Sequence, residues 1–432
     1  MFELRLREWS SVGPDEDAQL VGLRLDGAPE RAAAAVLKST GRLAIEELAT
    51  GLRVTSFSFV GRVQLGSLTI TIEPKLAKGA LLALVRYAYG LRDIQRQGSA
   101  AFATSGALLP DLLAAQLLGE VTELCARGLP RRYVERAEAL TMPRGRLDVA
   151  ALARRAVPAM SLPCRHHPRS ADHTMLQVVR AGLELAASIA SDGGLRLALR
   201  RLEARLGSEI ARAPLSRELV ASVRRRLTRL EQAAAPSLEL IALLLDGQAI
   251  TLDDETTVRL PGFLFDMNRF FQALIGRWLR DNLTECQVLD EKGLAGLLAY
   301  APEWNPRSRR APAPRPDFAV RRKSRPSILL DAKYRDLWER PLPREMLYQL
   351  AMYATSGAGD PVAVILFPTE DETAQEARID IRDVVSGAVR GGVALRPVPL
   401  PRLADLAWGT ESARRAEAER LVFGPGRHEG AE

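Results

Sequence analysis

Hydrophobic and polar residues alternate with the two-residue period of β-strands at two places near the N-terminus. One is FELRLREW (2–9) and the other is SLTITIEPK (67–75). The second follows another apolar stretch, and together they predict a hairpin with Gly66 and Ser67 at its turn. Between the two alternating segments, RLAIEELAT (42–50) predicts a short helix. We therefore expect the N-terminal region to be rich in β-structure.

Apolar residues three and four apart predict helices over most of residues 78–130 and 173–247. Gly193 and Gly194 are expected to end one of these helices. The pattern changes in the last third, where an amphipathic helix at 263–281 precedes short apolar strands. The predicted order there is helix, three strands, helix, strand. After the first helix, the three strands are CQVLDEK, DFAVRR and SILLDAKY. The second helix contains Gln349 and Tyr353, and the last strand is PVAVILF. The whole pattern predicts an α+β protein.

Composition narrows the class of protein. Hydrophobic residues make up 47% and charged residues 26% of the 432 residues, which is typical of a globular chain with two or three domains. The net charge of +7 permits nucleic-acid binding. Three cysteines without a CxxC pair indicate a reducing compartment. The first residues, MFELRLREWSS, lack the apolar stretch of a signal peptide, and no apolar run has the length of a membrane span. We expect a cytoplasmic protein that does not bind membranes.

The charged residues of SILLDAKY draw attention because lysine is rare in this chain. Only six of the 60 basic residues are lysines, so a lysine that remains favours a role that arginine cannot fill. Side chains alternate along a strand, so Asp331 and Lys333 are predicted to share one face. If the preceding strand pairs antiparallel with this one across a turn at 323–326, Asp317 lies beside them.

Two carboxylates and one ammonium are what metal-assisted phosphodiester hydrolysis requires. Mg²⁺ is usually held by one or two carboxylates together with waters and phosphate oxygens, and it lowers the pKa of a bound water. A nearby lysine can orient or deprotonate that water and offset charge on the phosphorus. Asp317 and Asp331 are therefore candidates for a magnesium site, and a lysine at 333 is consistent with this role. An ordinary solvated strand face is the alternative for a D-x-K motif.

Two further groups of residues are candidates. Gln349 and Tyr353 lie four apart on a helix and share a face that could look onto the same strands, with an exposed helix face as the alternative. The loop at 302–325 is rich in arginine and is predicted to contact DNA phosphates beside the site, with a solvated loop as the alternative. The arginines chosen for this role are Arg309, Arg310 and Arg322.

Taken together, these motifs resemble the RecB-like branch of the PD-(D/E)xK nucleases, and the whole chain resembles the McrC family. RPDF, LLDAKYRD and YQLAMYA resemble the nuclease motif, and FLFDMNRFFQALI resembles the helix that opens the family's nuclease domain. FVGRVQLGSLTITIEPK and MPRGRLDV (142–149) resemble two earlier segments that separate McrC from other nucleases of this fold. The resemblance covers about residues 1–400.

This resemblance implies the nuclease subunit of the McrBC restriction system, which acts on DNA with modified bases such as 5-methylcytosine. It also implies a partner, the AAA+ GTPase McrB, which forms a hexameric ring and is bound and stimulated by the N-terminal part of McrC. Asp317 and Asp331 would bind Mg²⁺, Lys333 would be the catalytic lysine, and Gln349 and Tyr353 would support them. Lys75, in the hairpin motif, is predicted to serve partner binding.

The implied domains are a β-rich partner-binding region at 1–140, a helical region at 141–255, a restriction-endonuclease-like α/β domain at 256–400 and a tail at 401–432. One residue departs from the family: Gln272 stands where the opening helix usually carries Glu. A neutral side chain there keeps open a non-catalytic scaffold that activates a GTPase ring. A stand-alone RecB-like nuclease is the third possibility.

Overall fold

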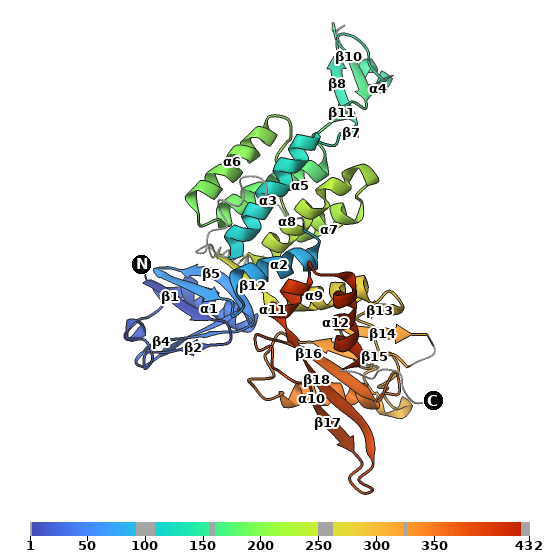
Figure 1. Cartoon of the computed structure of the whole chain (residues 1–432). Helices are drawn as coiled ribbons and strands as arrows, with labels where there is room; N and C mark the ends of the chain where they lie inside the picture. Colours follow the sequence, from blue (N-terminus) through green and yellow to red (C-terminus); the bar gives the residue numbers. More distant parts are fainter. Residues whose placement is uncertain (1, 92–108, 155–159, 249–261, 324–325, 425–432) are drawn as a thin grey trace. The chain divides into compact units, whose positions relative to one another are not determined.

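The structure is a computed structural model of the whole chain. It describes residues 2–91, 109–154, 160–248, 262–323 and 326–424. The chain forms two compact units, whose elements are labelled in Figure 1: residues 1–91 together with 264–432, and residues 92–263. The first unit is thus built from both ends of the chain. Within the described ranges, no helix is long and apolar enough to cross a membrane.

The N-terminal part of the first unit holds two small sheets, with strand orders β1-β6-β5-β12 and β2-β4-β3. Its elements are β1 (Phe2–Arg7), β2 (Ser11–Val12), η1 (Ala18–Leu20), α1 (Ala28–Ser39), β3 (Leu43–Leu48), β4 (Gly51–Ser56), β5 (Phe59–Leu65), β6 (Leu68–Glu73), α2 (Lys78–Tyr89) and β12 (Gly262–Asp266). Strands β5 and β6 pair antiparallel with Leu65 opposite Leu68, which confirms the predicted hairpin and its turn. Strands β1 and β6 run parallel, so both end at the same edge of their sheet.

The prediction of a helix at residues 42–50 is wrong. Leu43, Ala44 and Ile45 are buried in β3, which pairs with β4 along its whole length. Local sequence preference for a helix is weak, and strand pairing with buried apolar residues outweighs it here. The helix of this region is α1, which comes earlier in the chain.

The C-terminal part of the first unit is a six-stranded sheet in the order β13-β14-β15-β16-β18-β17, in which β15, β16 and β18 run parallel. Its elements are α9 (Met267–Asn282), β13 (Cys286–Asp290), η4 (Pro302–Trp304), β14 (Phe318–Arg322), β15 (Ile328–Ala332), α10 (Arg344–Thr355), β16 (Val362–Thr369), β17 (Ala377–Arg382), β18 (Val389–Pro399), α11 (Leu400–Leu406) and α12 (Glu411–Phe423). The order from α9 to β16 confirms the predicted helix, three strands, helix and strand. The predicted helix at 263–281 begins later than expected, because its first residues form β12.

Helices cover both faces of this sheet. The ring of Phe318 on β14 lies against Gly276 of α9. The next residue, Ala319, belongs to a buried cluster that includes Leu350 and Tyr353 of α10. Neighbouring residues of a strand point to opposite faces, so α9 and α10 lie on opposite sides. Odd-numbered residues of β14 and β15 therefore face α10.

The second unit combines helices with short strands. Its elements are α3 (Leu109–Arg127), β7 (Arg132–Tyr133), β8 (Arg136–Leu140), β9 (Arg146–Leu147), α4 (Val149–Ala153), β10 (Leu162–His166), β11 (Arg169–Ser170), α5 (Thr174–Ile189), α6 (Gly193–Gly207), α7 (Arg217–Arg225), η3 (Arg229–Ala234) and α8 (Ala235–Gly247). Helices α3, α5, α6 and α8 pack on one another. Gly193 begins α6 rather than ending a helix, because the Asp192 side chain caps it by accepting from the Leu195 N–H.

The two units divide the chain differently from the predicted domains. Helix α3 belongs with the helices of the second unit, not with an N-terminal region that reaches residue 140. The predicted tail at 401–432 contains most of α11 and all of α12, which pack on α2 and α9 respectively. Residues 425–432 lie outside the described ranges.

Candidate active site

Asp317, Asp331 and Lys333 meet where β14 begins and β15 ends. The two strands pair antiparallel, as the prediction of convergence required. Lys333 Nζ lies 2.8 Å from Asp331 Oδ2 and 3.4 Å from Asp317 Oδ2. The backbone N–H of Ala332 also donates to Asp317 Oδ2, at 2.8 Å. Two carboxylates and one ammonium therefore share a single site.

Burial gives this site unusual electrostatics. Asp331 is 2% exposed, and its Oδ1 atom is buried without a hydrogen-bond partner among the described residues. Burial, followed by the charge of Asp331, raises the pKa of Asp317 to about 6. Burial alone would lower the pKa of Lys333, but the charges of the two aspartates outweigh it and raise that pKa. One ammonium thus faces two carboxylates, and the site favours a further positive charge.

Gln272 of α9 reaches the same site. Its Nε2 atom donates to Asp317 Oδ1 at 3.2 Å. Gln272 is therefore in direct contact with a candidate metal ligand, and it supplies a neutral donor there. Among the described residues, no group of three or more His, Cys, Asp and Glu side chains is arranged to hold a metal ion.

Gln349 and Tyr353 lie on α10, the helix that covers the face of Asp331. Gln349 Nε2 donates to Tyr353 Oη at 2.6 Å, and Tyr353 is only 1% exposed. Tyr353 therefore does not lie on an exposed helix face. Burial raises the pKa of Tyr353, the bond from Gln349 partly offsets this, and the charges of Asp331 and Asp317 raise it further. The pair is within electrostatic reach of both carboxylates.

A cavity of about 530 Å³ lies next to this pair. One face of α10 forms its floor, and two loops of the same unit form its walls. Its lining residues are Leu298, Pro312, Ala313, Pro314, Glu345, Tyr348, Gln349 and Met352. Gln349 thus borders the cavity and also bonds to Tyr353, which connects the cavity to the neighbourhood of the carboxylates.

The predicted DNA-binding arginines fall into two groups. Arg309 and Arg310 are exposed and form no ion pair with any other described residue. Their loop is ordered by Asn305, whose Oδ1 accepts from the Arg309 N–H at 2.8 Å. Arg322 lies instead on β14, 3.6 Å from Glu285 and with its guanidinium over the ring of Phe423. Arg309 and Arg310 are the freer candidates for phosphate contacts.

Lys75 lies within the first unit, just after β6. Its Nζ atom is 3.2 Å from Glu339 Oε2, and its side chain is 27% exposed. Its backbone N–H donates to Glu8 Oε1 at 2.8 Å. The role of Lys75 in partner binding stays a prediction. Sequence patterns did not single out Glu8, which is one of the few buried charged residues of the described chain.

Comparisons with known proteins identify a family and structures of similar fold. A family model described as "McrBC 5-methylcytosine restriction system component" matches residues 54–368. A chain in the refined half-complex from the tetradecameric assembly of Thermococcus gammatolerans McrB AAA+ hexamers with bound McrC is similar in fold. Its TM-score is 0.61 at 20% identity, over 97% of this chain and 100% of that chain. A second structure, of the T. gammatolerans McrBC complex, matches with a TM-score of 0.44 at 20% identity, over 65% of this chain and 88% of that chain. No curated protein matches.

Proposed function

Because the chain belongs to the family of McrBC 5-methylcytosine restriction system components, we propose that it is an McrC-like endonuclease subunit that hydrolyses phosphodiester bonds of modified DNA. The observation that carries the proposal is the convergence of Asp317, Asp331 and Lys333 at one end of a buried sheet. A purely structural ion pair would need one carboxylate for one ammonium. The second buried carboxylate costs free energy and calls for a function.

The donor set fits Mg²⁺. The two carboxylates offer hard oxygen ligands, and Asp331 Oδ1 is a buried oxygen that no described group satisfies. Mg²⁺ uses one or two carboxylates and takes its remaining ligands from water and phosphate, so a third protein carboxylate is not required. When bound, the ion would supply Lewis-acid stabilisation of the phosphate and a more acidic water. We therefore infer that Asp317 and Asp331 hold Mg²⁺.

The remaining residues have separate tasks in this proposal. The Lys333 ammonium donates to a phosphate oxygen or to the attacking water, which offsets the charge that develops on phosphorus. Gln272 orients Asp317 through its 3.2 Å bond. Gln349 and Tyr353 place a polar pair next to the cavity beside the site. Arg309 and Arg310 bind the phosphates of the strand that enters this cavity.

We also propose a contact surface for a partner AAA+ GTPase ring. The small strands of the second unit, the short helix α4 and the turns beside them carry large apolar side chains that are exposed to solvent. They are Tyr133, Met142, Val149 and Met160, of which Met160 is 97% exposed. Exposed apolar surface of this kind is typical of protein interaction sites. Met142→Ser with Val149→Ser should raise the partner concentration needed for half-maximal stimulation of GTP hydrolysis, whereas Val385→Ser, at a still more exposed valine of the first unit, should not.

The decisive experiment measures DNA cleavage and GTP turnover in the same reaction. The full chain is mixed with its GTPase partner, GTP, Mg²⁺ and methylated DNA, and compared with Asp331→Ala. The variant should lose cleavage and keep stimulation of GTP hydrolysis. Asp405→Asn, which removes an exposed charge from α11, is the matched control and should keep both activities.

Each alternative has its own outcome in this experiment. If the wild-type protein stimulates GTP hydrolysis and leaves DNA uncut, the protein is a scaffold with an inactive nuclease fold. If it cuts DNA equally well without the partner and GTP, it is a stand-alone nuclease. If Asp331→Ala cuts as fast as the wild type, the assigned site is wrong.

A further inference from the structure

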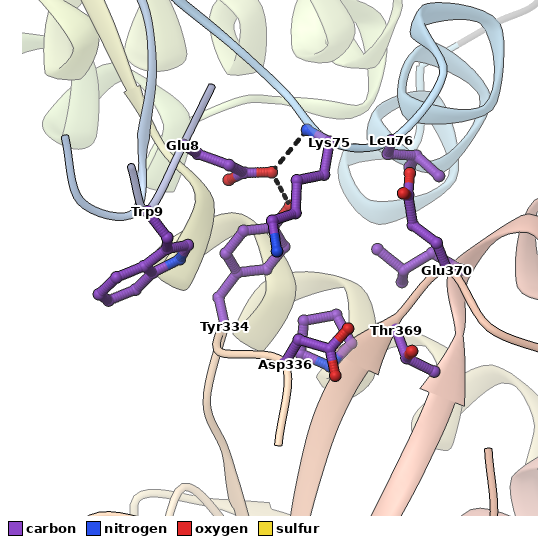
Figure 2. Close-up of a pocket in the computed structure, with 10 residues that line it drawn as sticks. Glu8, Trp9, Lys75, Leu76, Tyr334, Asp336, Thr369 and Glu370 are labelled. Carbon is purple, nitrogen blue, oxygen red and sulfur yellow. Dashed lines mark hydrogen bonds between the residues drawn. The ribbon is translucent and has the colours of Figure 1, made fainter. Parts of the chain in front are cut away.

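The segment that follows strand β15 is bonded to residues that lie just after β1 and β6 (Figure 2). Tyr334 Oη donates to Glu8 Oε1 at 2.9 Å. Six residues later, Arg340 Nη2 donates to the carbonyl oxygen of Trp9, also at 2.9 Å. All of these residues belong to the first unit, although they come from opposite ends of the chain. The N-terminal sheet is thus bonded to the residues directly after Lys333.

Glu8 is the centre of this junction. It is 1% exposed, and its Oε1 atom accepts from both Tyr334 Oη and the Lys75 N–H, the two bonds drawn in Figure 2. Its Oε2 atom is buried without a hydrogen-bond partner among the described residues. The next residue, Trp9, has a φ of 58°, a left-handed conformation that costs a bulky residue about 1–3 kcal/mol. An incidental contact would not keep a buried carboxylate beside a strained residue.

Tyr334 connects this junction to the active site because it is the residue directly after Lys333. The backbone of Lys333 makes two hydrogen bonds of its own: its N–H donates to the Leu366 carbonyl at 3.0 Å, and its carbonyl accepts from the Arg335 N–H at 2.8 Å. The ring of Tyr334 also packs edge-on against Phe271, at 6.1 Å between centroids. The Tyr334 side chain is therefore packed closely on the ring side. If it moves, the backbone of Tyr334 moves with it, and the peptide bond to Lys333 passes that movement on.

We propose that Glu8 and Tyr334 are positioning residues for DNA cleavage, which fix the backbone of Lys333 and thereby place its ammonium between the two carboxylates. The inference rests on the proposed nuclease function and adds residues of the N-terminal sheet to it. Neither residue touches Asp317 or Asp331 through a hydrogen bond in the described structure. Both act through the chain segment that carries Lys333.

The cavity at this junction is too small for a substrate. Its volume is about 30 Å³, which is room for one or two water molecules. Lys75, Asp336 and Glu370 line it together with Glu8 and Tyr334. No described group of acidic and histidine side chains is arranged to bind a metal ion here. A structural role of the junction therefore fits better than a ligand site.

The junction also makes the position of Lys333 depend on pH. Burial raises the pKa of Glu8 to about 7, although its bonds from Lys75 and Tyr334 oppose this. The charged and titratable groups that face Glu8 are Lys75 after β6, Tyr334 and Asp336 after β15, and Glu370 after β16. Ionised Glu8 accepts a charge-assisted bond from Tyr334, which is stronger than the bond to the neutral acid. Positioning should therefore improve as pH rises through about 7.

The test compares Tyr334→Phe, Glu8→Gln and the double variant with the wild type, as full chains with the GTPase partner, GTP, Mg²⁺ and methylated DNA. We expect kcat for cleavage to fall about ten- to a hundredfold in each single variant, with KM for DNA and stimulation of GTP hydrolysis unchanged. The double variant should lose no more activity than the more impaired single variant, because both substitutions act on one contact: Tyr334→Phe removes it and Glu8→Gln takes away its charge assistance. The rise of kcat through about pH 7 should be smaller in Glu8→Gln.

Tyr87→Phe is the matched control. Tyr87 also has a partly buried hydroxyl, which accepts from Asn282 Nδ2 at 3.1 Å between α2 and α9. This variant should keep the wild-type kcat. Hydrogen exchange of residues 333–340 reports the contact independently of cleavage, and it should rise in Tyr334→Phe and Glu8→Gln only.

The outcomes separate the two proposals. If the wild type cuts DNA and both single variants cut as fast, or if the two losses add in the double variant, the positioning role is wrong and the nuclease stands. If exchange at 333–340 is unchanged by Tyr334→Phe, the junction does not hold this segment and the positioning role is also wrong. A wild type that cuts no DNA would overturn the nuclease proposal, and the positioning role with it.

Discussion

Replacing Asp317 by Asn should make the metal-free protein more stable at neutral pH. The carboxylate of Asp317 is buried beside Asp331, and its pKa is raised from 3.8 to about 6. The group is therefore protonated more readily in the folded than in the unfolded chain. Its contribution to stability is complete below pH 3.8 and is lost as pH rises through about 6.

The size of the effect follows from the pKa. A rise of about two units corresponds to about 3 kcal/mol lost between roughly pH 4 and pH 6. Asparagine avoids this loss and can still accept from the Ala332 N–H, while Gln272 can rotate its amide to accept from the new NH₂ group. Loss of the negative charge that faces Lys333 reduces the gain, although Lys333 keeps its closer contact with Asp331. We expect Asp317→Asn to be about 1–3 kcal/mol more stable at pH 7.

The chain offers a selective probe for this measurement. All five tryptophans lie in residues 1–91 and 264–432, so tryptophan fluorescence reports unfolding of the first unit alone. Urea unfolding in EDTA should be recorded from pH 4 to pH 8 for the wild type, Asp317→Asn and Asp405→Asn. Across roughly pH 4–6 the wild type and Asp405→Asn should lose about 3 kcal/mol more stability than Asp317→Asn, because the loss that comes from Glu8 is common to all three. Equal or lower stability of Asp317→Asn at pH 7, or a difference that does not change with pH, would refute the reasoning.

Two further predictions concern DNA and metal binding. Arg309→Ala combined with Arg310→Ala should lower the salt slope of DNA binding by about two, measured as log Kd against log salt concentration, because each arginine would neutralise one phosphate. Arg322→Ala should change the slope less, since this guanidinium already pairs with Glu285. Gln272→Glu would place a carboxylate beside Asp317, so it should lower the urea midpoint in EDTA and raise the stabilisation gained from added Mg²⁺. Unchanged urea midpoints with and without Mg²⁺ would contradict this.

Features set by nearby residues could be predicted from the sequence. The β5–β6 hairpin follows from alternation around a two-residue Gly-Ser turn. The shared face of Asp331 and Lys333 follows from the two-residue period of a strand, and the place of Asp317 follows from antiparallel pairing across a short turn. Each of these depends on contacts within about twenty residues, where periodicity and turn chemistry are informative.

Features set by distant contacts could not be predicted in this way. Residues 42–50 are a separate case: their partner β4 is near in sequence, but their helix-like composition hid the strand Leu43–Leu48 that pairs with it. The bond between Glu8 and Tyr334 joins residues 326 apart in sequence. No local period distinguishes Glu8 from the polar positions of β1, and only the fold shows that it is buried. Gln272 is an intermediate case: the family resemblance singled it out, and the structure places its amide on Asp317.

The discontinuity of the first unit has a consequence for biosynthesis. The N-terminal strands leave the ribosome first, but β12 and the residues that bond to Glu8 and Trp9 are made only after residues 92–261. At about 5–20 residues per second, the N-terminal sheet waits roughly ten to forty seconds for its fourth strand. During that time the open edge of β5 is exposed to wrong pairing, and the second unit can already fold as an insertion. A gene fragment that starts near residue 256 would encode the catalytic strands without Glu8, so its product would lack the carboxylate that accepts from the Tyr334 hydroxyl.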